Sequence, residues 1–114
     1  MILSPGEKIH VVERRYFPGD ISRHFCGEVV ECSEQNLVRL KGYLWVWDAM
    51  KKEFIKKAEM REKILFLGDR LTVNVVPREV NLSSIKYVID IKRGLLVTDG
   101  KGWSLDINEY SSIN

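Results

Sequence analysis

The chain has 114 residues, of which 45% are hydrophobic and 30% are charged, and its formal net charge is +2. This length fits a single domain over residues 1–114, and the composition excludes an intrinsically disordered protein. The net charge lacks the basic excess of a dedicated nucleic-acid-binding protein, but it leaves local clusters of cations open.

The N-terminus, Met-Ile-Leu-Ser-Pro-Gly-Glu-Lys, contains neither the basic nor the apolar segment of a secretory signal. The longest apolar runs, at 44–47 and 64–67, are about a fifth of what a membrane-spanning helix needs. We therefore expect a cytoplasmic protein without a membrane partner.

Two cysteines, Cys26 and Cys32, lie on one predicted strand. At about 3.3 Å per residue their separation is roughly 20 Å, too far for a disulfide. The sequence predicts two reduced cysteines that act as small apolar side chains.

Turn signals that contain glycine recur about every ten residues, as in an antiparallel meander. They separate eight predicted strands, at 8–15, 24–32, 38–47, 54–66, 71–75, 85–91, 95–98 and 103–107. The loop at 16–20 contains Pro18-Gly19-Asp20, a turn sequence, and Pro77 lacks the backbone donor that would continue the strand before it.

The third predicted strand has the clearest alternation of side chains. One face carries Val38, Leu40, Gly42, Leu44 and Val46, and the other carries Arg39, Lys41, Tyr43, Trp45 and Trp47. Alternate residues of a strand point to opposite faces, so we expect the aliphatic set to face the core.

The segment 50–63 fits two structures. Its Lys, Glu, Ala and Met residues favour a helix, and Met50, Phe54 and Ala58 recur at helical spacing. A strand is favoured instead by a period of two in Phe54, Ala58, Met60, Ile64 and Phe66. We predict an all-β fold, either a small meander-type barrel or a strongly curled antiparallel sheet, and the alternative is α+β with one helix near 50–63.

Aromatic and cationic side chains combine on the outer side of the third strand and just after it. The candidate binding residues are Arg39, Lys41, Tyr43, Trp45, Trp47, Lys51, Lys52, Lys56 and Lys57, with Arg61 following. Such a row suits a protein interface or an aromatic packing layer, because aromatic residues are enriched at interfaces. It also suits single-stranded nucleic acid, whose bases stack on rings while cations meet phosphates.

A second basic group flanks the predicted loop at 16–22. It consists of Arg14, Arg15, Arg23 and His24, and it could bind an anion or a phosphate backbone if the two strand ends meet.

A third pattern, His24, Cys26 and Glu28, alternates along the second strand and therefore projects from one face. These residue types can ligate a metal or form a thiol–histidine pair, but a metal site needs three or four converging ligands. We predict no metal and no cofactor. The favoured function is a non-catalytic binding or assembly module that forms a homodimer or docks a protein partner; a weak single-stranded nucleic-acid binder and a small enzyme or metal protein are the alternatives.

Overall fold

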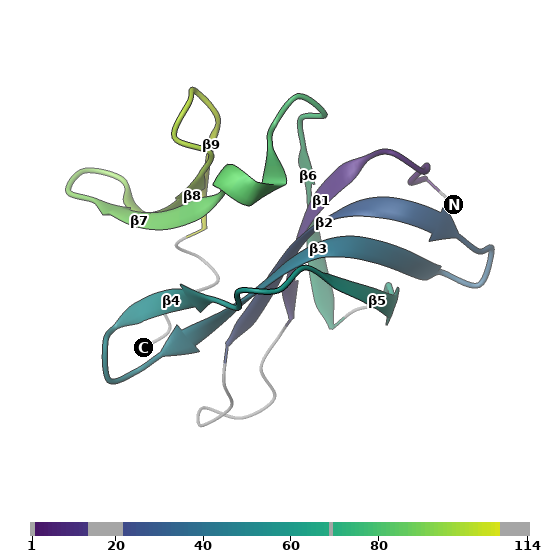
Figure 1. Cartoon of the computed structure of the whole chain (residues 1–114), viewed down its shortest axis with the longest axis horizontal. Helices are drawn as coiled ribbons and strands as arrows, with labels where there is room; N and C mark the ends of the chain where they lie inside the picture. Colours follow the sequence, from purple (N-terminus) through teal and green to yellow (C-terminus); the bar gives the residue numbers. More distant parts are fainter. Residues whose placement is uncertain (1, 14–21, 69, 108–114) are drawn as a thin grey trace. The chain divides into compact units, whose positions relative to one another are not determined.

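The computed structural model describes residues 2–13, 22–68 and 70–107, which form two compact units, Met1–Arg78 and Glu79–Asn114. The elements are β1 (Lys8–Glu13), β2 (Arg23–Cys32), β3 (Leu37–Asp48), β4 (Glu53–Lys56), β5 (Arg61–Phe66), β6 (Leu71–Val76), the 3-10 helix η1 (Leu82–Ser84), β7 (Lys86–Asp90), β8 (Gly94–Thr98) and β9 (Ser104–Asp106). Figure 1 shows these elements, and the predicted all-β fold is confirmed. Each unit has its own sheet, and a single domain over residues 1–114 stays a prediction.

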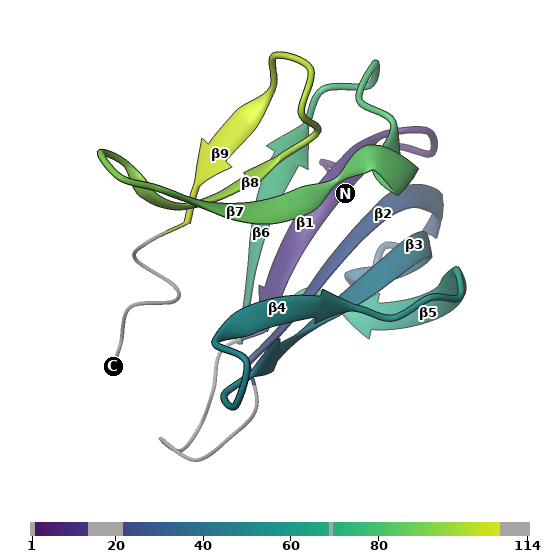
Figure 2. The same cartoon turned by 60° about the vertical axis from the view of Figure 1, so that its left-hand side comes forward.

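The first unit is an antiparallel six-stranded sheet, called here the main sheet, with the order β4-β3-β2-β1-β6. β5 pairs with β3 along the edge that β4 also uses, because β2 occupies the opposite edge of β3 from Val38 to Val46. Figure 2 shows β6, β1, β2 and β3 side by side in this order.

The main sheet is strongly curled and open. β2 and β3 are long strands that bend along their length (Figure 1). Among the described residues, β6 pairs only with β1, and β4 and β5 pair only with β3, so the sheet does not close on itself. Of the two predicted forms, the curled sheet is therefore the one observed, and the barrel is wrong.

The predicted helix alternative for 50–63 is also wrong, because this segment forms β4 and β5. Between Lys56, opposite Trp45, and Arg61, opposite Gly42, four residues face only two on β3, so residues 57–60 bulge out of the ladder. Pairing with the free edge of β3 outweighs the helix propensity of this segment, since it satisfies backbone groups on both strands.

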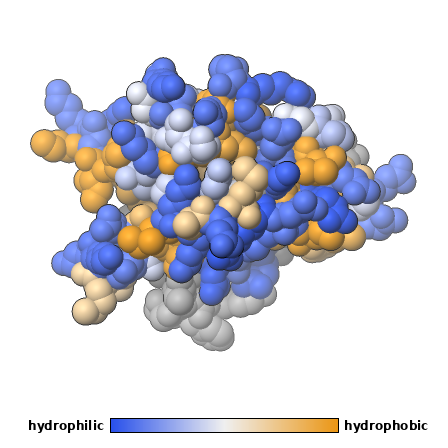
Figure 3. Space-filling model, viewed as in Figure 1, coloured by the Kyte–Doolittle hydropathy of each residue, from blue (hydrophilic) through white to orange (hydrophobic). Residues whose placement is uncertain are grey.

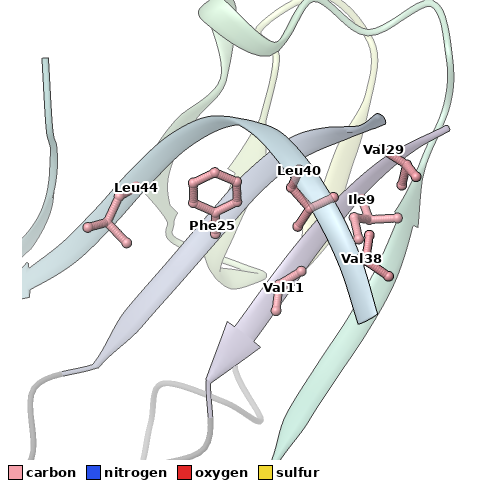
Figure 4. Close-up of a cluster of buried hydrophobic side chains, with 7 residues drawn as sticks. All are labelled: Ile9, Val11, Phe25, Val29, Val38, Leu40 and Leu44. Carbon is pink, nitrogen blue, oxygen red and sulfur yellow. The ribbon is translucent and has the colours of Figure 1, made fainter. Parts of the chain in front are cut away.

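The aliphatic face of β3 packs into the core, as predicted. Val38, Leu40 and Leu44 are buried in one cluster with residues from β1 and β2, namely Ile9, Val11, Phe25 and Val29. Figure 4 shows these side chains gathered between the bent β3 and the strands beside it. We call this the inner face of the main sheet, and the opposite side, which carries Tyr43, Trp45 and Trp47, the outer face.

A bulge in β2 changes which face its last residues occupy. The register shifts between Val29 and Glu31, so Cys32 pairs with Val38 and packs against the inner core, whereas Cys26 pairs with Tyr43 on the outer face. Both cysteines are free. The six-residue spacing alone would have put both thiols on one face.

The second unit is the three-stranded antiparallel sheet β7-β8-β9. Asp90 and Asp99 begin its two turns, and each carboxylate accepts backbone hydrogen bonds from residues that follow it, Lys92 and Arg93 in the first turn and Lys101 and Trp103 in the second. Figure 3 shows hydrophobic side chains exposed at the tip of the β7–β8 hairpin, where Ile91 is fully exposed. No helix in the described ranges is long and apolar enough to cross a membrane.

Candidate functional site

The predicted aromatic row lies on the outer face of β3, but its members are buried to different degrees. Trp45 is only 4% exposed, whereas Tyr43 and Trp47 are half-buried and Lys41 is exposed. A base or a partner side chain therefore has access to parts of Tyr43 and Trp47 but not to the ring of Trp45.

Lys56 of β4 contacts two rings of the aromatic row. It pairs with Trp45, and its Nζ lies 4.1 Å from the centroid of the Tyr43 ring and 5.8 Å from that of Trp45. These are cation–π distances. The ammonium group of Lys56 therefore already interacts with two aromatic rings of the same chain. The remaining predicted lysines, Lys51 and Lys52 in the β3–β4 turn and Lys57 after β4, are exposed.

Arg39, at the other end of the row, is engaged in two ion pairs. Its guanidinium contacts Glu62 on β5 at 2.9 Å and Glu31 on β2 at 3.3 Å. The hydrogen bonds to Glu62 and Glu31 raise the pKa of Arg39 above its ordinary value. This exposed network links three neighbouring strands across the outer face.

Beside the aromatic row, on the same face of the neighbouring strands β2 and β1, lies a buried cluster that includes both histidines. His24 pairs with Trp45, its ring centroid lies 5.1 Å from that of His10 and 4.6 Å from that of Phe54, and His10 Nδ1 lies 3.2 Å from the side-chain amide nitrogen of Asn74. Both histidines are almost completely buried. The sequence alternation placed His24 on one face of its strand with Cys26 and Glu28. The presence of His10 and Asn74 beside it depends on the pairing of β1 with β2 and β6, which no local pattern reveals.

Burial keeps this cluster uncharged. It lowers the pKa of His10 to about 4, and burial together with the nearby His10 lowers the pKa of His24 to about 3. Burial raises the pKa of the Cys26 thiol far above its ordinary value, although the charge of Lys56 acts in the opposite direction. At neutral pH the group therefore holds two neutral imidazoles and a thiol rather than a thiolate nucleophile.

His24, Cys26 and Glu28 do share the outer face, as the alternation predicts, yet they differ in environment. Cys26 and His24 are buried, whereas Glu28 is exposed and lies opposite Lys41. Within the described part of the chain, no group of three or more His, Cys, Asp or Glu side chains is arranged to hold a metal ion.

The predicted anion site has two members whose positions are described. Arg23 is exposed and pairs with Val46, and His24 is buried on the opposite face of β2. These two side chains therefore do not come together on one face, and His24 is neutral at pH 7. Arg14 and Arg15 lie outside the described residues.

A further candidate surface, which the sequence analysis did not identify, lies on the outer face where β3 begins and β5 ends. Leu37 pairs with Phe66, and Arg39 pairs with Ile64. Leu37, Ile64 and Phe66 are 42%, 56% and 62% exposed, and we call these three residues the edge patch. Figure 3 shows hydrophobic surface over β5.

The period of two at 54–66 did contain the signal for this patch. It correctly indicated a strand, and in that set Phe54 is buried whereas Ala58, Met60, Ile64 and Phe66 are exposed. Alternation alone does not say which face of a strand is covered, so the exposed set could not be told from a core set.

Comparison of the chain with models of protein families, with curated proteins and with solved structures found no match.

Proposed function

We propose that this protein is a non-catalytic, cytoplasmic binding or assembly module that self-associates, or docks a protein partner, through the outer face of its main sheet. The observation that carries the proposal is the edge patch, where Leu37, Ile64 and Phe66 expose adjoining apolar side chains. Contiguous exposed apolar surface is a feature of interaction sites, because a folded protein usually buries such surface away from water.

The surroundings of the patch support a protein partner. The Arg39–Glu62 and Arg39–Glu31 ion pairs border it, and half-buried Tyr43 lies farther along the same row. An apolar centre with a polar rim, and with aromatic residues nearby, is the usual composition of a protein–protein interface.

The non-catalytic part of the proposal follows from the buried cluster. A thiol nucleophile needs a lowered pKa, whereas burial raises the pKa of Cys26. A general base needs a pKa near the working pH, whereas burial lowers the pKa of His10 to about 4 and that of His24 to about 3.

Light scattering and sedimentation over a series of protein concentrations test this function. We expect concentration-dependent association that Phe66→Lys weakens, because a lysine on the patch would have to be desolvated in the interface. Val75→Lys is the matched control, because Val75 is an equally exposed residue of β6 at the other edge of the sheet, 66% exposed. A strict monomer that also captures no protein partner would contradict the proposal.

A single-stranded nucleic-acid binder is the second candidate. It is favoured by the exposed Lys41, Lys51 and Lys52 near the accessible rings of Tyr43 and Trp47. Titration of tryptophan fluorescence with an oligonucleotide at several salt concentrations tests it, with Trp47→Ala as the variant, since a bound base would stack on Trp47 and not on buried Trp45. The absence of salt-dependent quenching rules this candidate out.

A further inference from the structure

The outward edge of β5 is open to another strand. In the described ranges β5 pairs only with β3. Just beyond β5, the N–H of Leu67 donates a hydrogen bond of 2.8 Å to the carbonyl of Asn36 on the β3 side. Hydrogen-bonding direction alternates along an antiparallel strand, so Leu65 and Lys63 also face β3, and the N–H and C=O of Ile64 face away from it.

Both ends of this open edge are defined. The bulge at 57–60 precedes Arg61, and the chain turns after Phe66, whose carbonyl accepts the N–H of Gly68 at 3.0 Å. A Cβ on Gly68 would lie 2.8 Å from the Phe66 ring, so glycine leaves room for that ring to lie over the turn. The pairing surface is therefore β5 itself, six residues long.

Charged side chains commonly protect edge strands from pairing, but two of the three on β5 are engaged within the chain. Lys63 belongs to the inner face, opposite Leu40, with its Nζ 5.6 Å from the centroid of the Phe25 ring. Glu62 binds Arg39 at 2.9 Å. On the outer face of β5, Ile64 and Phe66 are thus the exposed apolar side chains next to the open edge.

We infer that β5 pairs antiparallel with β5 of a second copy of this chain, around a two-fold axis at Ile64, so that the two main sheets form one continuous sheet. This inference rests on the proposed function and specifies the partner and the register. Backbone pairing at an open strand edge is a general mode of association, and identical edges can pair symmetrically.

The distribution of charge and the length of the paired segment together select this register. A two-fold axis at Glu62 would place Glu62 opposite its own copy and Arg61 opposite Lys63, and like charges directly opposite each other are destabilising. An axis at Lys63 would place Lys63 opposite its own copy, which is destabilising for the same reason. An axis at Leu65 would pair only residues 64–66 of the two β5 strands with each other, whereas an axis at Ile64 pairs residues 62–66. With the axis at Ile64, this residue meets its own copy, and each Phe66 lies opposite Glu62 of the other strand.

The same register covers the edge patch. The two copies of Ile64 form the centre, and each Phe66 lies diagonal to Ile64 of the other copy, within reach of a large side chain. The Arg39–Glu62 ion pairs flank this centre on both sides. A second copy therefore brings Ile64 and Phe66 of both chains together, and the Glu62 carboxylate opposite each Phe66 is already paired with Arg39 of its own chain.

Single cysteines on β5 test the register in a Cys32→Ser background, with dissolved oxygen and a copper catalyst as the oxidant. Opposite residues in a hydrogen-bonded antiparallel pair have Cα atoms about 5.5 Å apart, within the range of a disulfide. Ile64→Cys alone should form a disulfide-linked dimer on a non-reducing gel. Glu62→Cys and Phe66→Cys should cross-link when mixed, and each should remain largely unlinked alone.

Ile64→Pro tests the backbone pairing independently. Proline removes an N–H that faces away from β3, so the β3–β5 ladder and the fold should persist by circular dichroism. Two hydrogen bonds are lost at the two-fold axis, and we expect the dissociation constant to rise at least about tenfold. Ile64→Ala keeps the N–H and separates the backbone effect from the side-chain effect.

The outcomes distinguish this inference from the function on which it rests. A dimer without the Ile64→Cys cross-link, or a folded Ile64→Pro variant with unchanged association, overturns β5 pairing and leaves assembly through another part of the outer face standing. A monomer at every soluble concentration overturns β5 pairing and leaves only docking on a different protein.

Discussion

At the scale of single residues, the two buried histidines make the stability of the fold depend on pH. In the unfolded chain both imidazoles titrate near 6.5, whereas in the fold the pKa of His10 is about 4 and that of His24 about 3. Between pH 6.5 and pH 3 the unfolded state therefore binds more protons. The contribution of the two histidines to stability should be constant above about pH 7 and should decrease progressively as the pH falls through that window.

Urea denaturation at a series of pH values measures this slope. His24→Phe is the informative variant, because it keeps a ring against Phe54 and removes one titrating group, and it should flatten the decline. Equal slopes in the wild type and in the variant would show that His24 is not the group whose protonation is penalised.

The tryptophans of the outer face should contribute unequally to stability. Trp45 is buried, so its replacement by alanine should lower the free energy of unfolding by about 3–5 kcal/mol. Trp47 is half-buried, with its ring centroid 5.2 Å from that of Phe54, so Trp47→Ala should cost clearly less. Chemical denaturation compares the two variants, and equal losses would contradict the difference in burial.

The candidate residues show where sequence reasoning is sufficient. Alternation correctly put Tyr43, Trp45 and Trp47 on the face opposite to the core cluster. It could not rank their burial, because that depends on which side chains cover each ring. The proximity of His10 to His24 likewise depends on strand pairing.

At the scale of elements, a glycine pair controls how closely β2 and β3 approach. Gly27 lies directly opposite Gly42. A Cβ on Gly42 would collide with the backbone carbonyl of Cys26 and lie 2.5 Å from the Cα of Gly27. The obstacle is backbone on the neighbouring strand, which no side-chain rotation can relieve.

Gly42→Val should therefore prevent the normal packing of β2 on β3, and we expect loss of the cooperative unfolding transition in thermal circular dichroism. Lys41→Ala is the matched control, since Lys41 is adjacent and exposed, and it should unfold like the wild type. A folded Gly42→Val protein of normal stability would show that the strands separate readily at this point.

Most strands could be predicted, because period-two patterns and turn residues are local signals. The two bulges could not. The one in β2 reverses the faces of Glu31 and Cys32 relative to simple counting, and the one at 57–60 divides one predicted strand into β4 and β5. A bulge depends on what the neighbouring strand offers as a partner, so a single strand's pattern does not specify it.

At the scale of the whole molecule, association should appear as a stability that depends on protein concentration. If two copies pair through β5, the dimer is favoured by mass action, and the thermal midpoint should rise as concentration increases. Differential scanning calorimetry of the wild type and of Ile64→Pro measures this, and the variant should show little dependence. A wild-type midpoint that does not change with concentration contradicts association of the folded state.

Strand order was not predictable from the sequence. β6 pairs with β1 across residues that are far apart in the chain, and β5 returns to β3 instead of continuing the meander. The choice between a barrel and a curled sheet depends on these non-local pairings, whereas the choice between helix and strand at 50–63 depends on the free edge of β3.

The open sheet also determines how large an assembly can become. Its two ends differ, with β5 at one edge and β6 at the other. Pairing of β5 with β5 consumes both copies of the same edge and stops at two chains, whereas pairing of β5 with β6 would leave one edge of each kind exposed and could repeat indefinitely into a fibre. The preference of β5 for its own copy is therefore what separates a finite particle from an endless one.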